Sequence, residues 1–190
     1  MIDNLPTAGD DDGSYDEGYE EGRKVFWSTY QDNGNRSNYL YAFSNWPEAA
    51  FKPMYNIYPT NAQSMLANVS WTCTLPEIEV ECGMKFDFSR CTNFNGMLAW
   101  NNIKNVGFID TTACAELNLA FANSSFETMS LKLKNDGSQK MTNTFSGCSK
   151  IINLTITEGL IGTSVSFNVA KDLSLDSVQS IIDHLKDLTD

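Results

Sequence analysis

Five tripeptides of this chain share one pattern: Phe43-Ser44-Asn45, Leu66-Ala67-Asn68, Leu98-Ala99-Trp100, Phe121-Ala122-Asn123 and Phe145-Ser146-Gly147. Each begins with a large apolar residue, which we call an anchor, and continues with a small residue. Successive anchors are separated by 23, 32, 23 and 24 residues. Such a repeat length is typical of proteins built from stacked units.

Further apolar residues keep fixed places relative to the anchors. Phe94, Leu117 and Met141 each lie four residues before an anchor. After most anchors comes a set in which apolar and polar residues alternate, and this alternation predicts a short strand with one buried face. The predicted strands contain Leu75, Ile78 and Val80; Val106 and Phe108; Met129, Leu131 and Leu133; Leu154 and Ile156; and finally Val165, Phe167 and Val169 with Leu173 and Leu175.

One repeat is too small to fold alone. Burying a Phe or Leu side chain contributes about 1.5 to 3 kcal/mol, whereas ordering each residue around it costs roughly 1 to 2 kcal/mol. Stacking against neighbouring repeats supplies the missing burial. We therefore predict an α+β repeat fold, a solenoid of short strands over residues 38–170. The longer spacing between Leu66 and Leu98 predicts an extra loop at Cys82 to Cys91.

The N-terminal residues divide into an acidic arm and a helix. Residues 1–13 hold Asp10, Asp11 and Asp12 and lack periodicity, while 14–34 begin with a capping serine and end near Gly34. The spacing of four aromatic residues places them on one helix face: they are Tyr15, Tyr19, Phe26 and Tyr30. That face either caps the N-terminal end of the solenoid or bundles with copies of itself.

Residues 171–190 are predicted to cap the other end. A helix beginning after Ser174 places a set of apolar residues on one stripe: Val178, Ile181, Ile182, Leu185 and Leu188. The last repeat of a solenoid exposes its core, and a helix with one apolar face covers such an end.

Composition excludes several classes of protein. The formal net charge is -11 and the isoelectric point is near 4.4, with Lys and Arg scattered along the chain, so binding to nucleic acid or to anionic lipid is disfavoured. Apolar runs are shorter than the twenty or so residues needed to cross a bilayer. Met1 to Pro6 lack the basic and apolar segments of a secretory signal. The five cysteines lack metal-ligand spacing and are expected to be reduced, buried packing residues.

Candidates for catalysis are few. The single histidine, His184, is predicted on the polar side of the C-terminal helix, and the sequence shows no nucleophile or nucleotide motif. Glu77, Glu79 and Glu81 alternate with apolar residues, so we interpret them as the solvent face of a strand. A glycosidase pair drawn from them is the enzymatic alternative. We expect no enzyme, no metal and no cofactor.

The segments Phe145-Ser146-Gly147-Cys148-Ser149-Lys150-Ile151 and Cys114-Ala115-Glu116-Leu117-Asn118-Leu119-Ala120-Phe121 resemble the BspA-like leucine-rich repeats. The resemblance covers roughly residues 38–170 and is most specific over 114–156. It implies adhesion or binding through a strand-lined face, and it supplies no catalytic residues.

A narrower resemblance is carried by a combination of segments: Tyr15-Asp16-Glu17-Gly18-Tyr19-Glu20-Glu21-Gly22-Arg23, Phe26-Trp27, Gln31-Asp32-Asn33-Gly34-Asn35-Arg36, Tyr41-Ala42-Phe43, Trp46, Phe51-Lys52-Pro53 and the closing Ser174 to Leu185. This combination is similar to repeat proteins encoded in structural-gene regions of Firmicutes phages and prophages. It implies a protein located in the virion.

Together these features predict a non-enzymatic phage virion protein, structural or accessory, that displays a repeat solenoid. Its expected partners are other virion proteins, contacted through the N-terminal arm and helix, and a protein or glycan of the host surface. A homo-oligomer is compatible with the aromatic helix face. The alternatives are a bacterial surface adhesin or secreted binding module, located at the cell surface, and a carbohydrate-active enzyme.

Overall fold

The computed structural model describes residues 38–39, 41–45, 56–83, 85–167 and 169–187. The predicted arm (1–13) and N-terminal helix (14–34) lie outside these residues. So do five residues with predicted roles: Tyr15, Tyr19, Phe26, Tyr30 and Leu188.

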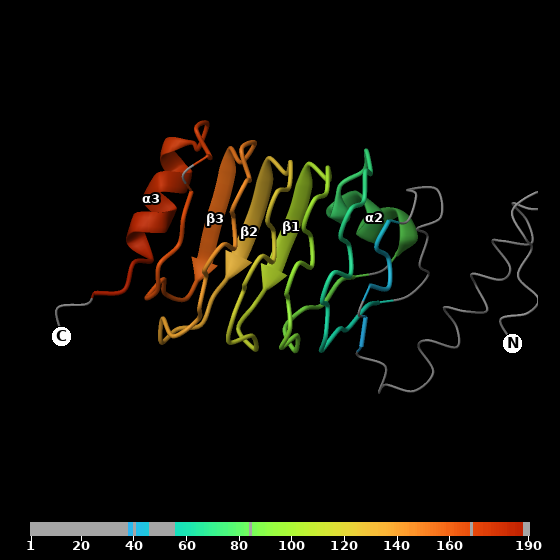
Figure 1. Ribbon diagram of the computed structural model, residues 1–190, viewed down its shortest axis with the longest axis horizontal. Coiled ribbons are helices and arrows are strands. Elements are labelled where there is room, and N and C mark those ends of the chain that lie inside the picture. Colours follow the sequence, from blue (N-terminus) through green and yellow to red (C-terminus); the bar gives the residue numbers. More distant parts are fainter. Residues whose placement is uncertain (1–37, 40, 46–55, 84, 168, 188–190) are drawn as a thin grey trace, which may run out of the picture.

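Three parallel strands form an open sheet, with a short helix beside each of its edges (Figure 1). The strands lie in chain order and are β1 (Asn105–Asp110), β2 (Thr128–Lys132) and β3 (Asn153–Glu158). Helix α2 (Leu75–Cys82) contacts β1, and helix α3 (Leu175–Asp183) contacts β3. The class is α/β rather than the predicted α+β, because each strand is followed by a long connection that returns the chain to the same end of the sheet.

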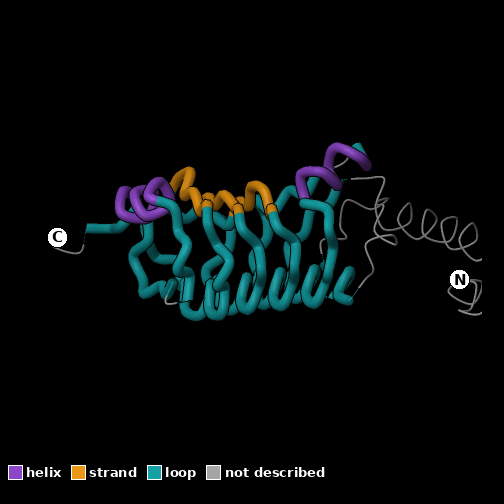
Figure 2. Tube along the Cα trace, turned by 90° about the horizontal axis from the view of Figure 1, so that it is seen from above, coloured by secondary structure: helices purple, strands orange, loops and turns teal. Residues whose placement is uncertain are grey.

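Each of the five anchors lies in a turn, and we call these turns together the turn row. Figure 2 shows loop and turn segments along the side of the molecule away from the strands. The anchor N–H donates to the carbonyl just before the next anchor: Leu66 to Met97 at 2.8 Å, Leu98 to Ala120 at 2.8 Å and Phe121 to Thr144 at 3.1 Å are examples. All five anchors are buried, as predicted. The turns are therefore joined to one another along the long axis.

Positive φ angles flank every anchor. The residues two before and two after it have φ near +50 to +80°: Tyr41 and Asn45, Ser64 and Asn68, Gly96 and Trp100, Leu119 and Asn123, and Asn143 and Gly147. This left-handed conformation costs most L-residues roughly 1 to 2 kcal/mol, and Gly and Asn tolerate it best. The repeat is thus defined by backbone conformation as well as by side-chain size.

The core runs between the turn row and the sheet. Aromatic rings of successive repeats stack along it: the centroids of Phe121 and Phe145 are 5.6 Å apart, and those of Phe145 and Phe167 are 4.9 Å apart. The residues predicted four before the anchors are all buried: Phe94, Leu117 and Met141. The expected continuous core is confirmed for these repeats.

The strand predictions hold for β2 and β3 and fail in part for β1. The predicted inward residues of β2 and β3 are buried. In β1, Val106 is buried, but Phe108 is 54% exposed and Ile109 takes the inward place. Gly107 has φ +74°, and the register with β2 shifts between Asn105 and Phe108, so the alternation is broken there.

The strand predicted at Leu75, Ile78 and Val80 was wrong, because this segment forms helix α2. Thr74 accepts from the N–H of Glu77, and the Glu77 carboxylate accepts from the N–H of Thr74 at 2.7 Å, which is a capping box. Leu75 and Ile78 are buried one helical turn apart, whereas Val80 is 83% exposed. The extra length therefore includes a helix upstream of the predicted loop at Cys82 to Cys91.

The C-terminal helix is confirmed, but its predicted apolar stripe is not the face that covers the sheet. Val178, Ile182 and Leu185 are exposed, and Ile181 alone of the described stripe packs against the core. Residues 165–167 and 169 contain no strand, contrary to the prediction, and Leu175 lies in the helix. Instead, the hydroxyl oxygens of Ser177 and Ser180 accept from the N–H groups of Leu154 at 2.9 Å and Ile156 at 2.8 Å.

The described thiols are free, as expected for packing residues. Cys91, Cys114 and Cys148 are buried, and Cys73 is half-buried. The Cys148 thiol donates to the Phe121 carbonyl at 2.9 Å in the preceding repeat. Burial raises the pKa of Cys91 and of Cys148 to about 11 and also raises the pKa of Cys114. These thiols therefore stay protonated and act as donors near neutral pH.

Candidate binding face and pocket

The outward side of the sheet carries one large aromatic side chain on an otherwise polar surface. Strand register places Phe108 beside Ser130 of β2, and Ser130 beside Thr155 of β3. We call this surface the outer face; its remaining members are Asn105, Asp110, Thr128, Lys132, Asn153 and Glu158. All of these residues are at least partly exposed. Phe108 is therefore the most apolar feature of the outer face.

A row of charges crosses the outer face at the C-terminal ends of the strands. Asp110 pairs in register with Lys132, and Lys132 with Glu158. The Lys132 ammonium lies 2.6 Å from a Glu158 carboxylate oxygen, and this hydrogen bond raises the pKa of Lys132. The pair is exposed, so it adds little to stability. Its main effect is to fix a charge pattern of alternating sign on this surface.

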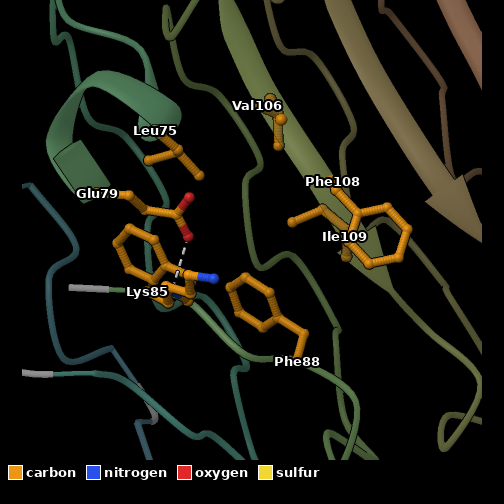
Figure 3. Close-up of a pocket in the computed structure, with 9 residues that line it drawn as sticks. Leu75, Glu79, Lys85, Phe88, Val106, Phe108 and Ile109 are labelled. Atoms are coloured by element: carbon orange, nitrogen blue, oxygen red, sulfur yellow. Dashed lines mark hydrogen bonds between the residues drawn. The ribbon is translucent and has the colours of Figure 1, made fainter.

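A pocket of about 200 Å³ lies between α2 and β1, next to Phe108 (Figure 3). Helix α2 supplies one wall, β1 supplies the opposite wall, and residues 85–88 supply the third. Its lining residues are Leu75, Glu79, Lys85, Phe86, Phe88, Val106, Gly107, Phe108 and Ile109. The volume is that of six or seven water molecules at about 30 Å³ each. It is large enough for one bulky side chain of a partner.

Two local features set the shape of the pocket. A Cβ atom at Gly107 would lie 2.9 Å from Cγ of Pro76, so the missing side chain lets the start of α2 approach β1. A Glu79 carboxylate oxygen accepts from the N–H of Phe86 at 2.8 Å, which ties the helix to the segment that follows it. Lys85 is exposed at the edge of the pocket.

Two of the three predicted catalytic candidates are held in structural contacts: Glu77 caps α2, and Glu79 binds the Phe86 amide. Glu81 is exposed and lines, with Glu77, a separate hollow beside Val80. Glu79 lines the pocket and Glu77 does not. On a helix, residues two apart point in different directions, so the interpretation of these acids as one strand face was wrong. Within the described residues, the glycosidase alternative has no facing carboxylate pair in this pocket.

His184 ends helix α3. Its Nδ1 lies 2.7 Å from the carbonyl oxygen of Ser180, and the residue is half-buried. Among the described residues, no group of three His, Cys, Asp or Glu side chains is placed to hold a metal ion. In the same part of the chain, no helix is long and apolar enough to cross a bilayer.

Sequence reasoning missed both the pocket and the exposure of Phe108. Two signals were present: Thr74, Pro76 and Glu77 form a helix-start signature, and Gly107 interrupts the alternation of β1. The predicted attachment residues Tyr15, Tyr19, Phe26 and Tyr30 lie outside the described chain.

Comparison with known proteins found no matching family model, no matching curated protein and no matching solved structure.

Proposed function

We propose that this protein is a non-enzymatic virion component that binds another protein through the outer face of its sheet. The observation that carries this proposal is the exposed ring of Phe108, which stands beside a 200 Å³ pocket on an otherwise polar surface.

We also propose that residues 38–170 form a leucine-rich-repeat-like solenoid. Hydrogen bonds between successive turns and paired positive φ angles recur at every described anchor, and a parallel strand follows each of the last three anchors. Such repeats present broad surfaces built from equivalent positions. The outer face is a surface of this kind, because strand register aligns its residues across three repeats.

Protein binding fits the composition of the outer face. Interfaces commonly consist of an aromatic anchor near a pocket, surrounded by polar residues that exclude water. Phe108 and the pocket supply the first part, and Ser130, Thr155 and the Lys132–Glu158 pair supply the second. Phe108 leaves 54% of its surface exposed within the described chain, so packing inside the fold does not account for most of that surface.

The virion setting rests on the resemblance to phage-encoded repeat proteins. In this proposal the acidic arm (1–13) and the helix (14–34) attach the protein to other virion proteins through Tyr15, Tyr19, Phe26 and Tyr30. The outer face is then left for a second protein, on the particle or on the host.

The test is to purify particles of the phage or induced prophage that encodes this chain and to search them for the chain by mass spectrometry. We expect a fixed copy number per particle and cross-links from the outer face to one other protein. Phe108→Ser should abolish those cross-links without unfolding the chain. Tyr58→Ser is the matched control, because Tyr58 is a comparably exposed aromatic residue elsewhere. Particles that lack the chain would overturn the proposal.

A further inference from the structure

One exposed tryptophan interrupts a row of asparagines on the turn row. The residues two after each anchor are Asn45, Asn68, Trp100, Asn123 and Gly147, and we call them the asparagine row. All have positive φ, and all are exposed. Four of them are residue types that tolerate this conformation, and Trp100, with φ +55°, is the exception.

Hydrogen bonds fix the neighbours of Trp100. The N–H of Asn68 donates to the Ala99 carbonyl at 3.0 Å, and the N–H of Trp100 donates to the Ala122 carbonyl at 3.0 Å. The backbone of Trp100 therefore lies between those of Asn68 and Asn123. The asparagine row contains no ionisable side chain.

The fold does not account for Trp100. A bulky residue at positive φ is strained, and Trp100 nevertheless leaves 55% of its surface exposed. The residues two before each anchor are mixed in type, so a positive φ alone singles out none of them. In the asparagine row, by contrast, Trp100 is the only residue that is neither Asn nor Gly. Strain kept at an exposed position points to a functional role.

We propose that Trp100, with Asn68, binds a neutral saccharide. The indole supplies a flat apolar surface for the C–H face of a sugar ring. The Asn68 amide offers donors and an acceptor, which match the hydroxyl groups of a sugar. Asn123, the other neighbour, has its Oδ1 atom against Gly147 of the next repeat. Single-stranded nucleic acid would also stack on the ring, but it requires cationic groups along its backbone, and the chain carries a formal net charge of -11.

This site is separate from the proposed protein contact. The turn row lies on the side of the molecule opposite the strands, so the outer face and Trp100 can be occupied independently (Figure 2). A single flat platform binds weakly, and display of many copies on one particle would raise the apparent affinity through multivalency. Loss of one site should therefore leave the other intact.

The test is to place the full chain on a microarray of neutral oligosaccharides of hexoses and N-acetylhexosamines, with sialylated and sulfated glycans on the same slide. We expect binding to a subset of the neutral glycans. Titration of a bound oligosaccharide should then show at least tenfold weaker binding for Trp100→Asn and retained, weaker binding for Trp100→Phe. Trp100→Asn restores the residue type of the neighbouring repeats, so it should fold, and circular dichroism checks this.

Tyr41→Asn is the matched control, because Tyr41 is also an exposed aromatic residue at positive φ and lies outside the asparagine row. It should bind like the unmodified protein. The proposal is overturned if no neutral glycan binds at millimolar concentration, if only charged glycans bind, if Trp100→Asn binds as tightly as the unmodified chain, or if Trp100 is found in contact with a protein partner instead.

Discussion

The two edge strands of the sheet, β3 and β1, differ in how a neighbouring helix contacts them. At β3, helix α3 presents serine hydroxyls to the strand, and Ser177 both accepts from the Leu154 N–H and donates to the Ile152 carbonyl at 3.0 Å. At β1, helix α2 contacts the strand closely at Gly107, and beyond that contact a pocket remains. An unpaired strand edge invites pairing with other chains. One edge is closed by its own helix, and the other is left with a space that a partner can fill.

The difference shows what each helix sequence provides. Ser177 and Ser180 lie three apart on α3, so both reach the β3 edge from one face of the helix. The residue of α2 closest to a comparable role is Glu79, and its carboxylate is directed to the Phe86 amide instead of to β1. The polar side chains of the two helices therefore determine that β3, and not β1, is hydrogen-bonded to its helix.

Removal of a shared anchor should have the largest effect on both edges. Phe121→Ala should lower the free energy of unfolding by about 3 to 5 kcal/mol, because it leaves a cavity among stacked rings. Chemical denaturation measures this loss, and amide hydrogen exchange should rise in β1 and β3 alike. Lys134→Ala is the control and should be nearly silent. If Phe121→Ala and Lys134→Ala had the same denaturation midpoint, the conclusion that one continuous core runs through the repeats would be contradicted.

Ser177→Ala should have the next largest effect, confined to the β3 edge. It leaves the Leu154 N–H without its partner, at a cost of about 1 to 3 kcal/mol. The Ile152 carbonyl loses the Ser177 hydroxyl but still accepts from the Ser174 N–H at 2.9 Å. Exchange of the Leu154 amide should accelerate while that of β1 does not. At the β1 edge, Glu79→Ala should cost less than about 1 kcal/mol, because Glu79 is half-exposed. If Glu79→Ala lowered the free energy of unfolding more than Ser177→Ala, helix α2 would be held more strongly at its edge of the sheet than helix α3 is.

Alkaline pH should weaken the packing at both ends of the sheet. Burial raises the pKa of Cys91, before β1, and of Cys148, before β3, from 9.0 to about 11. The unfolded chain then loses its thiol protons first, so stability is fully present below about pH 9 and is lost as pH rises toward 11. Thermal unfolding between pH 8 and 11 measures the loss. Cys91→Ala and Cys148→Ala should each reduce the loss of thermal stability between pH 8 and 11. If neither variant changed this pH dependence, the two thiols would not be its source.

The smallest effect on stability should come from Phe108. Phe108→Ser should change the free energy of unfolding by less than about 0.5 kcal/mol, because the ring is exposed. Thermal unfolding checks this, with Ile109→Ser as the contrasting variant, since Ile109 is buried in the same strand. If both variants were equally destabilised, Phe108 would be a packing residue and not a free binding group.

The sequence predicted the repeated elements better than the departures from the repeat. Anchor spacing located the turns, β2 and β3, because each inward residue in them has an equivalent one repeat away. Helix α2 was missed because Leu75, Ile78 and Val80 were taken as alternating, although Leu75 and Ile78 are three apart and a capping box precedes them. Phe108 was placed inward because a two-residue period ignores the irregularity at Gly107.

The faces of α3 could not be assigned from hydrophobicity. Periodicity selects the most apolar stripe of a helix, whereas the β3 edge presents backbone N–H and carbonyl groups that need polar partners. Ser177 and Ser180 satisfy them, and Val178 and Ile182 are left exposed. The sequence signals at the start of α2 and at Gly107 identify the two walls of the pocket, but not that these walls meet, because α2 and β1 are brought together by tertiary packing.

The turn row runs unbroken past the pocket. Leu66 donates to Met97 and Leu98 donates to Ala120, while on the opposite side β1 pairs as a strand with β2. The space between α2 and β1 is therefore bounded on the strand side by packing at Gly107 and not by strand pairing. Its width is set by the side chains that meet there, so a single substitution at Gly107 would alter the pocket without breaking a hydrogen bond between strands.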